Sequence, residues 1–439
     1  MPLTRASMTL SYFLYRYFST GLYFLLFPAY ELYKKISGRS YEDIDQRLGK
    51  YQPSIANKGK NATRIWIHAA SVGEVSAAAS IIEELYKTIP DCEIIFSTTT
   101  RHGLSFARKS IGSRFLCLIY APLDFIVSVR RAIRFFKPDI LVCIETEIWP
   151  NWLAEAHRMG VKTAIVNGRI SARSINRYIK IKPLFKKILS RVDTFSMIRP
   201  EDARRIKLLG ALQKRIQING NSKYDLLIKQ AVPDFEKKFK NFLDRENWKT
   251  VLVAGSTRNL EEEIILDVYQ EICRDFPETK LIIAPRHIER ASYIKKLVNK
   301  KGLDCLLRTE IAENSEPSSI LIMDTIGELM TVYSLATVVF CGGSLVPLGG
   351  HNILEAAVWG KPVFYGPFMD DFLDARDLLE KTGGGISVMN GKELTKKTLD
   401  ILMNPEKAKR LGDAAREAVL SNKGAAERHA AAIRKTLNL

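Results

Sequence analysis

From residue 64 onward, short apolar runs alternate with segments of helical periodicity. The apolar runs of the first half predict strands at 64–68, 93–98, 115–120, 139–144, 162–166 and 193–197. Amphipathic spacing between the runs predicts helices, for example at 74–88, 101–110, 124–136 and 149–159. Strands that alternate with helices in this way predict a parallel sheet with helices on both faces.

A second alternating series follows the stretch INGNSKYDL at 218–226 and a lysine-rich segment that includes 237–240. Its predicted strands are 250–254, 280–284, 319–322, 337–341 and 362–364, and helices are predicted throughout 393–439. The fold class is therefore α/β, with two doubly wound Rossmann-like domains facing across a cleft at the carboxyl ends of their sheets. We place a hydrophobic anchor segment at 1–35 and the two domains at 36–225 and 226–439.

Residues 6–30 are apolar and aromatic, and Arg16 is their only charge. The segment is long enough to cross a bilayer, which takes about 20 residues. Its many Tyr and Phe side chains also suit the membrane interface. A tilted span, an in-plane anchor and a core helix of the first domain are all open interpretations. Basic residues at Lys34, Lys35 and Arg39 favour the cytoplasmic side for the remainder of the chain.

The chain has 66 basic and 48 acidic residues, a net charge of +18. Such a charge predicts an acidic partner, which could be nucleic acid, anionic lipid or a phosphorylated substrate. No aromatic RNA-binding pattern accompanies the basic residues, so we predict no nucleic-acid partner. The six cysteines have no zinc or redox spacing, and several lie in apolar runs. We therefore expect reduced, buried thiols.

The stretch SVGE at 71–74 places Glu74 where a predicted strand gives way to a helix. Acids are favoured in the first turn of a helix, so a purely structural role explains this residue. The alternative is a carboxylate that the helix dipole keeps ionised for proton transfer. Gly73 adds no side-chain bulk beside this carboxylate. The spacing alone supports both interpretations equally.

In the second half, the stretch 338–367 has the strongest indications of a ligand-binding site. A predicted strand ends at Gly342–Gly343, and a second pair, Gly349–Gly350, precedes a helix start at His351–Asn352. Bare backbone at a helix N-terminus suits a phosphate. Glu355, one turn further on, could reach the hydroxyls of a ribose. Two glycine pairs with a downstream acid in one crossover predict a nucleotide-sugar site.

Two other strand ends of the second half admit both a structural and a ligand-binding interpretation. Ser256 and Thr257 either cap the following helix or help to hold an anion. Arg286 either pairs with a phosphate or makes a surface ion pair, and His287 could equally be a packed loop residue. The sequence does not choose between these roles.

The stretch DTIGEL at 324–329 follows the apolar run ILIM. Asp324 or Thr325 would cap a helix here, with Glu328 in its first turn. Capping is sufficient to explain these residues.

In this order and spacing, the chain resembles the 3-deoxy-D-manno-octulosonic acid (Kdo) transferases of lipopolysaccharide synthesis, which have the glycosyltransferase B-type (GT-B) fold. The resemblance runs from about residue 9 to the C-terminus. It is carried by HAASVGEV (68–75), FSTTT (96–100), YAPLD (120–124), IETEIWPN (144–151), NGRISARS (167–174), GNSKYD (220–225), AGSTR (254–258), APRHIER (284–290), DTIGEL (324–329) and GGSLVPLGGHNILEAA (342–357).

The resemblance implies CMP-Kdo as donor, a lipid A precursor (lipid IVA) as acceptor, and inverting transfer without a metal or cofactor. It implies that Glu74 is the catalytic base and that Glu145 and Lys223 stabilise the transition state. The implied CMP contacts are Pro285, Arg286, Ile326, Gly327, Glu328, Asn352, Ile353, Leu354 and Glu355. From the strand-end and glycine patterns we add Ser256, Thr257, His287, Gly350 and His351.

Two positions depart from the pattern of the family. Arg258 stands where the motif GSTH has histidine, which leaves a donor contact from this position open. Ser222 stands in GNSKYD where a hydrophobic residue is common, and we expect this change to matter little.

The expected chemistry requires positive charge at several places. Lys223, Arg286 and the helix start at Asn352 could neutralise the CMP leaving group. Glu145, at the end of an apolar strand, needs a cation such as Arg169 or Lys223, because a buried lone carboxylate is costly. An anionic membrane surface, the cytoplasmic face of the inner membrane, would attract a basic face of the first domain. Candidates for that face are Arg169, Arg173, Arg177, Lys180 and Lys182.

Two other hypotheses compete with a Kdo transferase. One is another GT-B sugar-nucleotide enzyme, a UDP-sugar transferase or an epimerase, which would leave SVGE and ETEIWPN unexplained. The other is a non-catalytic, basic, membrane-bound scaffold, for which a change of Glu74 to Gln would have no effect on binding.

Overall fold

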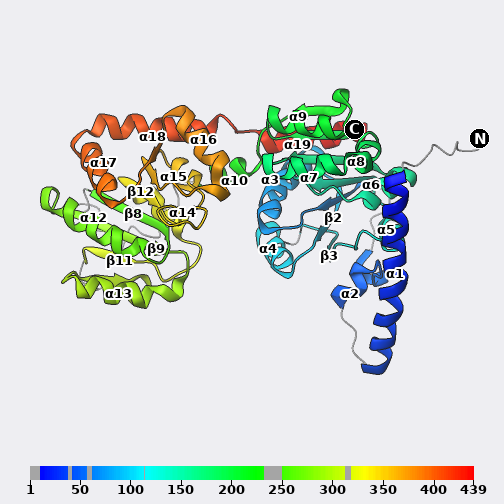
Figure 1. Ribbon diagram of the computed structural model, residues 1–439, viewed down its shortest axis with the longest axis horizontal. Helices are drawn as coiled ribbons and strands as arrows, with labels where there is room; N and C mark the ends of the chain where they lie inside the picture. The colour runs from blue at the N-terminus through cyan, green and yellow to red at the C-terminus, as the bar shows by residue number, and fades with distance from the viewer. Residues whose placement is uncertain (1–9, 38–41, 57–61, 113, 232–249, 312–317) are drawn as a thin grey trace, which may run out of the picture. The chain divides into compact units, whose positions relative to one another are not determined.

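The computed structural model describes residues 10–37, 42–56, 62–112, 114–231, 250–311 and 318–439. The chain forms two compact units, Met1–Leu226 together with Gly424–Leu439, and Leu227–Lys423 (Figure 1). The predicted lysine-rich segment at 237–240, Arg39, and the side chains of Lys34 and Arg173 lie outside the described residues. Each unit is built on its own sheet.

The first unit contains a seven-stranded parallel sheet of order β3-β2-β1-β4-β5-β6-β7. Its strands are β1 (Arg64–His68), β2 (Glu93–Thr98), β3 (Cys117–Tyr120), β4 (Ile140–Ile144), β5 (Lys162–Gly168), β6 (Thr194–Met197) and β7 (Ile216–Ile218). The predicted strands are confirmed, and β7 adds a short edge strand that the apolar pattern did not indicate. Strand β1 pairs with both β2 and β4, so the order of the strands reverses between β1 and β4.

Helices cover both faces of this sheet. The helices of this unit are α1 (Leu10–Ser37), α2 (Glu42–Arg47), α3 (Val72–Thr88), α4 (Arg101–Ile111), α5 (Ile126–Phe136), α6 (Pro150–Arg158), α7 (Ala172–Lys180), α8 (Lys182–Leu189) and α9 (Pro200–Leu209), with single turns η1 (Pro53–Ala56) and η2 (Gln213–Arg215). Helix α10 (Lys223–Gln230) begins in this unit and ends in the second. Neighbouring residues of β1 enter different cores. Trp66 packs with α5, α6 and α8, whereas Ile65 and Ile67 pack with α3 and α4. This alternation is the side-chain period of a strand that is buried on both faces.

The last helix, α19 (Ala425–Thr436), returns to the first unit (Figure 1). The predicted domain at 226–439 is therefore wrong for its final residues, 424–439. Ala426, Ala430 and Ile433 are buried in the same core as α3. The alanines allow the two helices to approach closely. Helical periodicity predicts that such a segment is a helix, but it does not indicate which sheet the helix covers.

The second unit also contains a seven-stranded parallel sheet, of order β10-β11-β9-β8-β12-β13-β14. Its strands are β8 (Thr250–Thr257), β9 (Thr279–Pro285), β10 (Cys305–Leu307), β11 (Ile320–Ile322), β12 (Val338–Cys341), β13 (Val363–Tyr365) and β14 (Gly385–Ser387). Its helices are α12 (Glu261–Asp275), α13 (Ala291–Lys300), α14 (Leu329–Leu335), α15 (Leu354–Ala357), α16 (Leu373–Thr382), α17 (Gly391–Met403) and α18 (Pro405–Leu420), with turns η4 (Ile288–Arg290), η5 (Arg308–Glu310) and η6 (Asp370–Phe372). The predicted strands are again confirmed, and β10 and β14 are additional edge strands.

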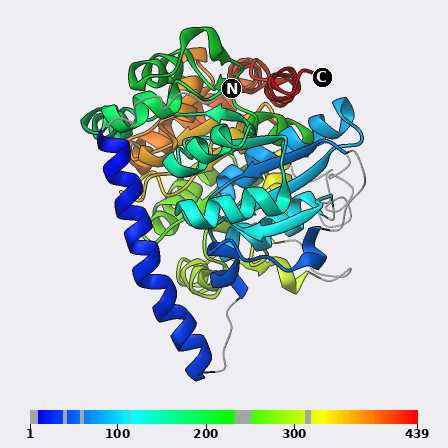
Figure 2. The ribbon, with the colours of Figure 1, turned by 90° about the vertical axis from the view of Figure 1, so that its right-hand side faces the viewer.

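Helix α1 contains most of the apolar N-terminal segment. Among the described residues, no helix has both the length and the apolar character needed to cross a membrane. One side of α1 is bound to the first unit, where Tyr15 Oη donates to Asp124 over 2.6 Å and Arg131 donates to Tyr23 Oη over 2.9 Å. The other side exposes large apolar side chains, including Leu10, Leu14, Phe18, Phe24, Leu25, Leu32 and Ile36. Figure 2 shows the C-terminal part of α1 extending beyond the sheet of its unit.

Candidate active site

Three acidic residues of the first unit follow the strands at which its sheet order reverses. Glu74 follows β1 and lies in the first turn of α3, while Glu145 and Glu147 follow β4. Strands β1 and β4 are hydrogen-bonded neighbours. In doubly wound sheets ligands bind outside the carboxyl ends of the strands at such a switch point. The topology therefore brings Glu74 and Glu145, which are far apart in sequence, to one edge of the sheet.

The carboxylate of Glu74 helps to close the turn before α3. Ser71 is the N-cap, and its Oγ accepts a hydrogen bond from Glu74 N over 3.4 Å. In return, the Glu74 carboxylate accepts from Ala70 N over 2.7 Å and from Ser71 Oγ over 3.0 Å. This reciprocal arrangement resembles a capping box. The structural interpretation of Glu74 is thus correct, but a carboxylate has further lone pairs that remain available for a proton.

The pKa of Glu74 is raised to about 7. Burial is the largest cause, the negative charges of Glu147 and Glu145 add to it, and the hydrogen bonds from Ala70 and Ser71 oppose it. Burial and two neighbouring carboxylates therefore outweigh the helix dipole, which was expected to favour the ionised form of Glu74. A carboxyl group with a pKa near neutrality is well suited to act as a general base.

Glu145 has the cationic partner that the sequence requires. Its Oε1 lies 2.6 Å from Lys223 Nζ, so Lys223 makes the predicted ion pair. Glu145 has a φ of 57°, in the left-handed region that glutamate rarely adopts. Backbone strain of this kind is common at functional sites. A β-carbon at Gly73 would lie 3.4 Å from Lys223 Nζ, so the amine is close to the turn that precedes Glu74.

The sequence analysis missed His68 and Glu147. His68 is fully buried at the end of β1, and its Nε2 lies 3.5 Å from Glu147 Oε2. Trp149 Nε1 also donates to Glu147, over 2.6 Å. Burial raises the pKa of Glu147, but the hydrogen bond and charge of His68, with the bond from Trp149, bring it below its usual value. The second acid of ETE and the histidine that opens HAASVGEV were the visible indications of this pair.

In the second unit, a cavity of about 350 Å³ gathers part of the predicted donor site. The predicted residues that line it are Ser256, Arg286, Gly327, His351, Asn352 and Glu355. The remaining lining residues, which were not predicted, are Gln230, Leu329, Met330, Tyr333 and Phe372. The predicted residues that do not line it are Thr257, Pro285, His287, Ile326, Glu328, Gly350, Ile353 and Leu354.

The polar groups of this cavity can recognise a nucleotide. Arg286 supplies a guanidinium that can bind a phosphate in bidentate fashion. His351 Nε2 is buried without a hydrogen-bond partner among the described residues. Burial, followed by the charges of Arg286 and Arg258, lowers the pKa of His351 to about 4, so its ring is neutral. Asn352 Nδ2 donates to Glu355 Oε1 over 3.2 Å and so orients a carboxylate that can accept from hydroxyl groups.

The first glycine pair does not present free backbone donors to a phosphate. The N–H groups of Gly343, Ser344 and Leu345 donate to the buried carboxylate of Glu261 over 2.6, 3.0 and 2.9 Å. Glu261 therefore accepts the hydrogen bonds of these three N–H groups. The helix after the second pair, α15, has only four residues. The phosphate predicted at the helix start after the second pair stays a prediction, and the side chains that line the cavity offer further groups for recognition.

The predicted helix caps of the second unit are also corrected. Strand β8 continues to Thr257, and α12 begins only at Glu261, after Leu260. Ser256 and Thr257 therefore do not cap α12. Ser256 instead adopts a φ of 55° at the end of the strand and lines the cavity.

In the stretch DTIGEL, neither Asp324 nor Thr325 caps α14, whose N-cap is Glu328. Asp324 accepts a hydrogen bond from Thr309 N over 3.0 Å, and Thr325 donates to the carboxylate of Glu328. Glu328 also pairs with Arg308 over 3.2 Å. These polar side chains therefore hold the loop before α14 in place.

Arg258, which stands in place of the family's histidine, contacts another predicted residue. Its Nη1 lies 2.6 Å from Nε2 of His287. A guanidinium can only donate, so this ring nitrogen is the acceptor. His287 is therefore engaged with Arg258 and does not line the donor cavity.

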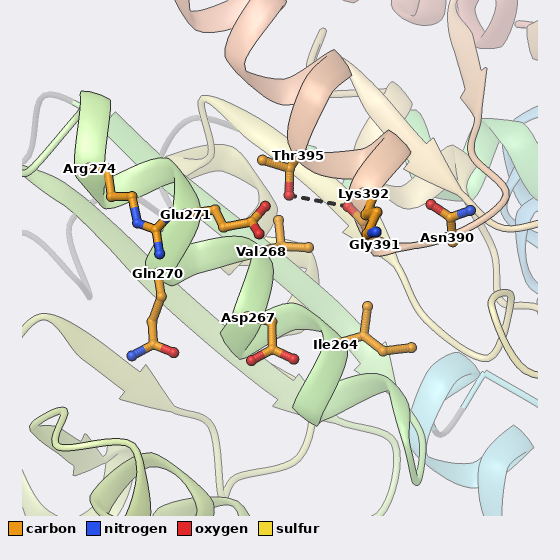
Figure 3. Close-up of a pocket in the computed structure, with 10 residues that line it drawn as sticks. All are labelled: Ile264, Asp267, Val268, Gln270, Glu271, Arg274, Asn390, Gly391, Lys392 and Thr395. Atoms are coloured by element: carbon orange, nitrogen blue, oxygen red, sulfur yellow. Dashed lines mark hydrogen bonds between the residues drawn. The ribbon is translucent and has the colours of Figure 1, made fainter.

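A larger cavity, of about 680 Å³, lies between α12 and α17 (Figure 3). The charged side chains that line it are of both signs: Asp267, Glu271, Arg274 and Lys392. Thr395 Oγ1 donates to the carbonyl of Gly391 over 3.1 Å within its wall. It contains none of the predicted donor residues, and its mixed charges do not favour an anion. The smaller cavity, which gathers six of the predicted donor residues, is therefore the better candidate for a nucleotide site.

The comparisons of sequence find one family. Residues 42–226 match the family described as 3-deoxy-D-manno-octulosonic-acid transferase (kdotransferase). The 3-deoxy-D-manno-octulosonic acid transferase of Haemophilus influenzae is 32% identical over 83% of this chain and 85% of its own length. That of Aquifex aeolicus is 33% identical over 77% of this chain and 86% of its own length. Among solved structures, a UDP-N-acetylglucosamine 2-epimerase of Listeria monocytogenes matches 86% of this chain and 97% of its own with a TM-score of 0.60 at 15% identity. This likeness confirms the predicted GT-B architecture.

Proposed function

Because this chain belongs to the 3-deoxy-D-manno-octulosonic acid transferase family of lipopolysaccharide biosynthesis, we propose that it transfers Kdo from CMP-Kdo to the lipid A precursor lipid IVA. Transfer inverts the anomeric carbon and requires neither a metal nor a cofactor. The observation that carries this proposal is the cluster of Glu74, Glu145 and Lys223 at the carboxyl ends of β1 and β4.

Glu74 is the base of the reaction. An acceptor hydroxyl attacks the anomeric carbon of Kdo, its proton passes to the Glu74 carboxylate, and the bond from Kdo to the CMP phosphate breaks. Attack on the face opposite the leaving group inverts the anomeric centre. The pKa of about 7 supports this role, because such a group is substantially ionised at neutral pH and still binds a proton well.

Lys223 and Glu145 act as a pair. Lys223 stabilises the negative charge that grows as CMP departs, and Glu145 holds the ammonium in place at 2.6 Å. The fixed side-chain cation provides charge stabilisation that does not need to reorganise during the reaction. Activity that persists in the presence of a chelator is the expected consequence.

The donor CMP occupies the cavity of about 350 Å³ in the second unit. Arg286 binds the phosphate, and Glu355, oriented by Asn352, accepts from the ribose hydroxyls. His351 supplies a neutral ring nitrogen to the same ligand.

We also propose that the first unit docks on the cytoplasmic face of the inner membrane. The exposed apolar side of α1 would enter the interface, where Phe18 and Leu25 are 73% and 71% exposed. A groove of about 760 Å³ along α8 combines apolar and basic side chains: Ile179, Lys182, Pro183, Lys186, Lys187, Ser190, Gly210 and Leu212. Arg177 and Lys180 are exposed nearby in sequence, and Arg169 and Lys182 are half-buried. Each basic residue near anionic lipid contributes about 1 kcal/mol.

The test is incubation of the purified protein with CMP-Kdo and tetraacylated lipid A precursor, followed by mass analysis of the lipid. We expect added Kdo with and without EDTA, and the number of additions counts the transfers. Glu74→Gln should abolish product, whereas Glu84→Gln, ten residues further along the same helix, should not, because Glu84 forms an ion pair with the exposed Lys87.

Several results would reject the proposal. Turnover of a UDP-sugar without Kdo transfer would favour another GT-B enzyme. Membrane or nucleotide binding without any turnover would favour a scaffold. Loss of product with EDTA, restored by a divalent metal, would reject metal independence alone.

A further inference from the structure

The C-terminal helix α19 contacts the loop that carries the proposed catalytic lysine. This loop, residues 219–222, connects β7 to α10, whose first residue is Lys223. Arg428 Nε donates to the carbonyl of Asn219 over 3.0 Å, and His429 Nε2 contacts the carbonyl of Gly220 over 3.0 Å. Helix α19 therefore holds a loop that is distant in sequence. The two residues of each contact are 209 positions apart.

The contacts of His429 define the state of its ring. Nε2 faces the carbonyl of Gly220, which can only accept, so Nε2 carries the proton. Nδ1 lies 2.6 Å from Ser196 Oγ and 3.5 Å from Asn167 N, and both of these groups can donate to it. The ring is fully buried. Burial lowers the pKa of His429 to about 4, so the neutral ring persists at physiological pH.

The same network continues from His429 to the helix that carries Glu74. Asn167 accepts a hydrogen bond from Ser222 N over 2.9 Å through its side-chain oxygen. Ser222 Oγ lies 3.0 Å from the carbonyl of Ala77 in α3. Ser222 is fully buried. The expectation that this serine matters little is therefore not supported by its contacts, since it links the loop both to β5 and to α3.

A second attachment secures the other side of Lys223. The carboxylate of Asp225 accepts from Gly424 N and Ala426 N, each over 2.7 Å, at the start of α19. These bonds satisfy backbone donors that a helix leaves unpaired at its N-terminus. Lys223 thus lies between two segments that α19 contacts, the loop 219–222 and Asp225.

We infer that His429 is a positioning residue for Lys223: its bonds to Gly220, Ser196 and Asn167 hold the loop 219–222 so that Lys223 Nζ stays beside Glu145. The expected effect of His429 on kcat rests on the proposed function. The placement of the loop itself is independent of the reaction.

The expected effect follows from the geometry of the ion pair. The pair is 2.6 Å long, and the main chain of the loop determines where the lysine side chain begins. A displacement of about 1 Å at a catalytic group can reduce a rate by roughly 100-fold. We therefore expect His429→Leu to lower kcat by at least tenfold, with a smaller change in KM, because the residue contacts neither substrate.

The experiment measures the ion pair directly, by the rate at which Lys223 is reductively methylated in the full-length protein. Methylation requires the nitrogen of Lys223 to leave the carboxylate of Glu145 and reach the reagent, and the ion pair of 2.6 Å opposes this movement. Exposed Lys180 is the internal reference in each digest, which is read by mass spectrometry. Glu145→Gln removes the partner and defines the rate of an unpaired lysine. The matched control is Thr436→Val, which removes a buried hydroxyl of α19 that bonds to Thr194 over 2.7 Å, away from the loop.

The inference predicts that His429→Leu raises methylation of Lys223 toward the Glu145→Gln rate and lowers kcat, while Thr436→Val changes neither. His429→Asn, which has a shorter amide side chain, should show the same effect if the leucine variant does not fold. His429→Gln, which can still donate to Gly220, should restore slow methylation.

A folded His429→Leu or His429→Asn protein with wild-type methylation would overturn the inference. An equal increase in Thr436→Val would also overturn it, since the effect would then be general loosening of α19. If the wild-type protein transfers no Kdo, the proposed function fails, but the methylation series still decides whether His429 places Lys223.

Discussion

The raised pKa of Glu74 predicts a specific pH dependence of Kdo transfer. A shift from 4.5 to about 7 corresponds to about 3 kcal/mol in favour of the protonated carboxyl group. At pH 6 a base with this pKa is only about 10% ionised, whereas an unshifted glutamate would be about 97% ionised. Below neutrality, kcat/KM should therefore fall by about tenfold per pH unit if Glu74 is the base.

Glu147→Gln perturbs this dependence without changing Glu74 itself. The substitution removes a negative charge that raises the pKa of Glu74. The midpoint of the pH profile should therefore move to lower pH, and at pH 6 the variant should keep a larger share of its maximal rate than the wild type does. The maximal rate reports separately on any other role of Glu147.

The stability of the protein provides a second measurement that does not depend on turnover. Because the folded-state pKa is raised, ionisation of Glu74 weakens the folded state, and the stability present below about pH 4.5 is lost as pH rises through about 7. Glu74→Gln, which resembles the protonated form, should raise the free energy of unfolding at pH 8 by up to about 3 kcal/mol. At pH 4 it should change little.

The assay is the initial rate of Kdo transfer at limiting substrate between pH 5.5 and 8.5, at constant ionic strength, with Glu84→Gln as control. A flat wild-type profile from pH 6 to 8 would refute the reasoning, as would a midpoint that rises in Glu147→Gln. Denaturant unfolding at pH 4 and pH 8 completes the test, and a destabilised Glu74→Gln protein at pH 8 would show that the capping role outweighs the electrostatic cost.

Three further substitutions test separate parts of the molecule. Lys223→Met should lower kcat by roughly 100-fold or more through lost charge stabilisation, measured by product mass in single-turnover reactions. Arg286→Lys keeps the charge but loses bidentate geometry, so calorimetry should show CMP binding weakened by about tenfold while unfolding is unchanged. Tyr15→Phe removes the hydroxyl that donates to Asp124 over 2.6 Å, and urea unfolding should show a loss of about 1 kcal/mol because this buried acid loses one donor while it still accepts from Asn151 N and Trp152 N.

Most of the sheet could be predicted from the sequence because parallel strands buried on both faces form long apolar runs. The missed strands, β7, β10 and β14, have only three residues each and lie at sheet edges. Their side chains are half-buried or exposed, so no strong apolar pattern marks them. The return of α19 was missed for a different reason. Its alanine-rich pattern is compatible with packing against several helices. Its contact with α3 depends on the surface that α3 presents in the folded unit.

The candidate site was predictable where a residue's function follows from its place at a strand end. It was not predictable where function depends on a partner distant in sequence. His68 and Glu147 form a pair only because β1 and β4 are adjacent, in a register that sets His68 opposite Cys143. The occupied turn at Gly343 likewise depends on Glu261, which lies 82 residues away. A glycine pattern indicates that an anion can be bound there, but not that the chain already supplies the anion.

The partners of the three acids explain why Glu74 is the one suited to accept a proton. Glu145 is neutralised by Lys223, and Glu147 is hydrogen-bonded and paired with His68. Among the contacts that the described residues make with its carboxylate, Glu74 accepts from the neutral donors Ala70 N and Ser71 Oγ. Burial and the negative charges of Glu147 and Glu145 raise the pKa of Glu74. Two of the three carboxylates, Glu145 and Glu147, thus have a basic side chain as partner, whereas the described contacts of the Glu74 carboxylate are with neutral donors, which is the arrangement expected if Glu74 is the base.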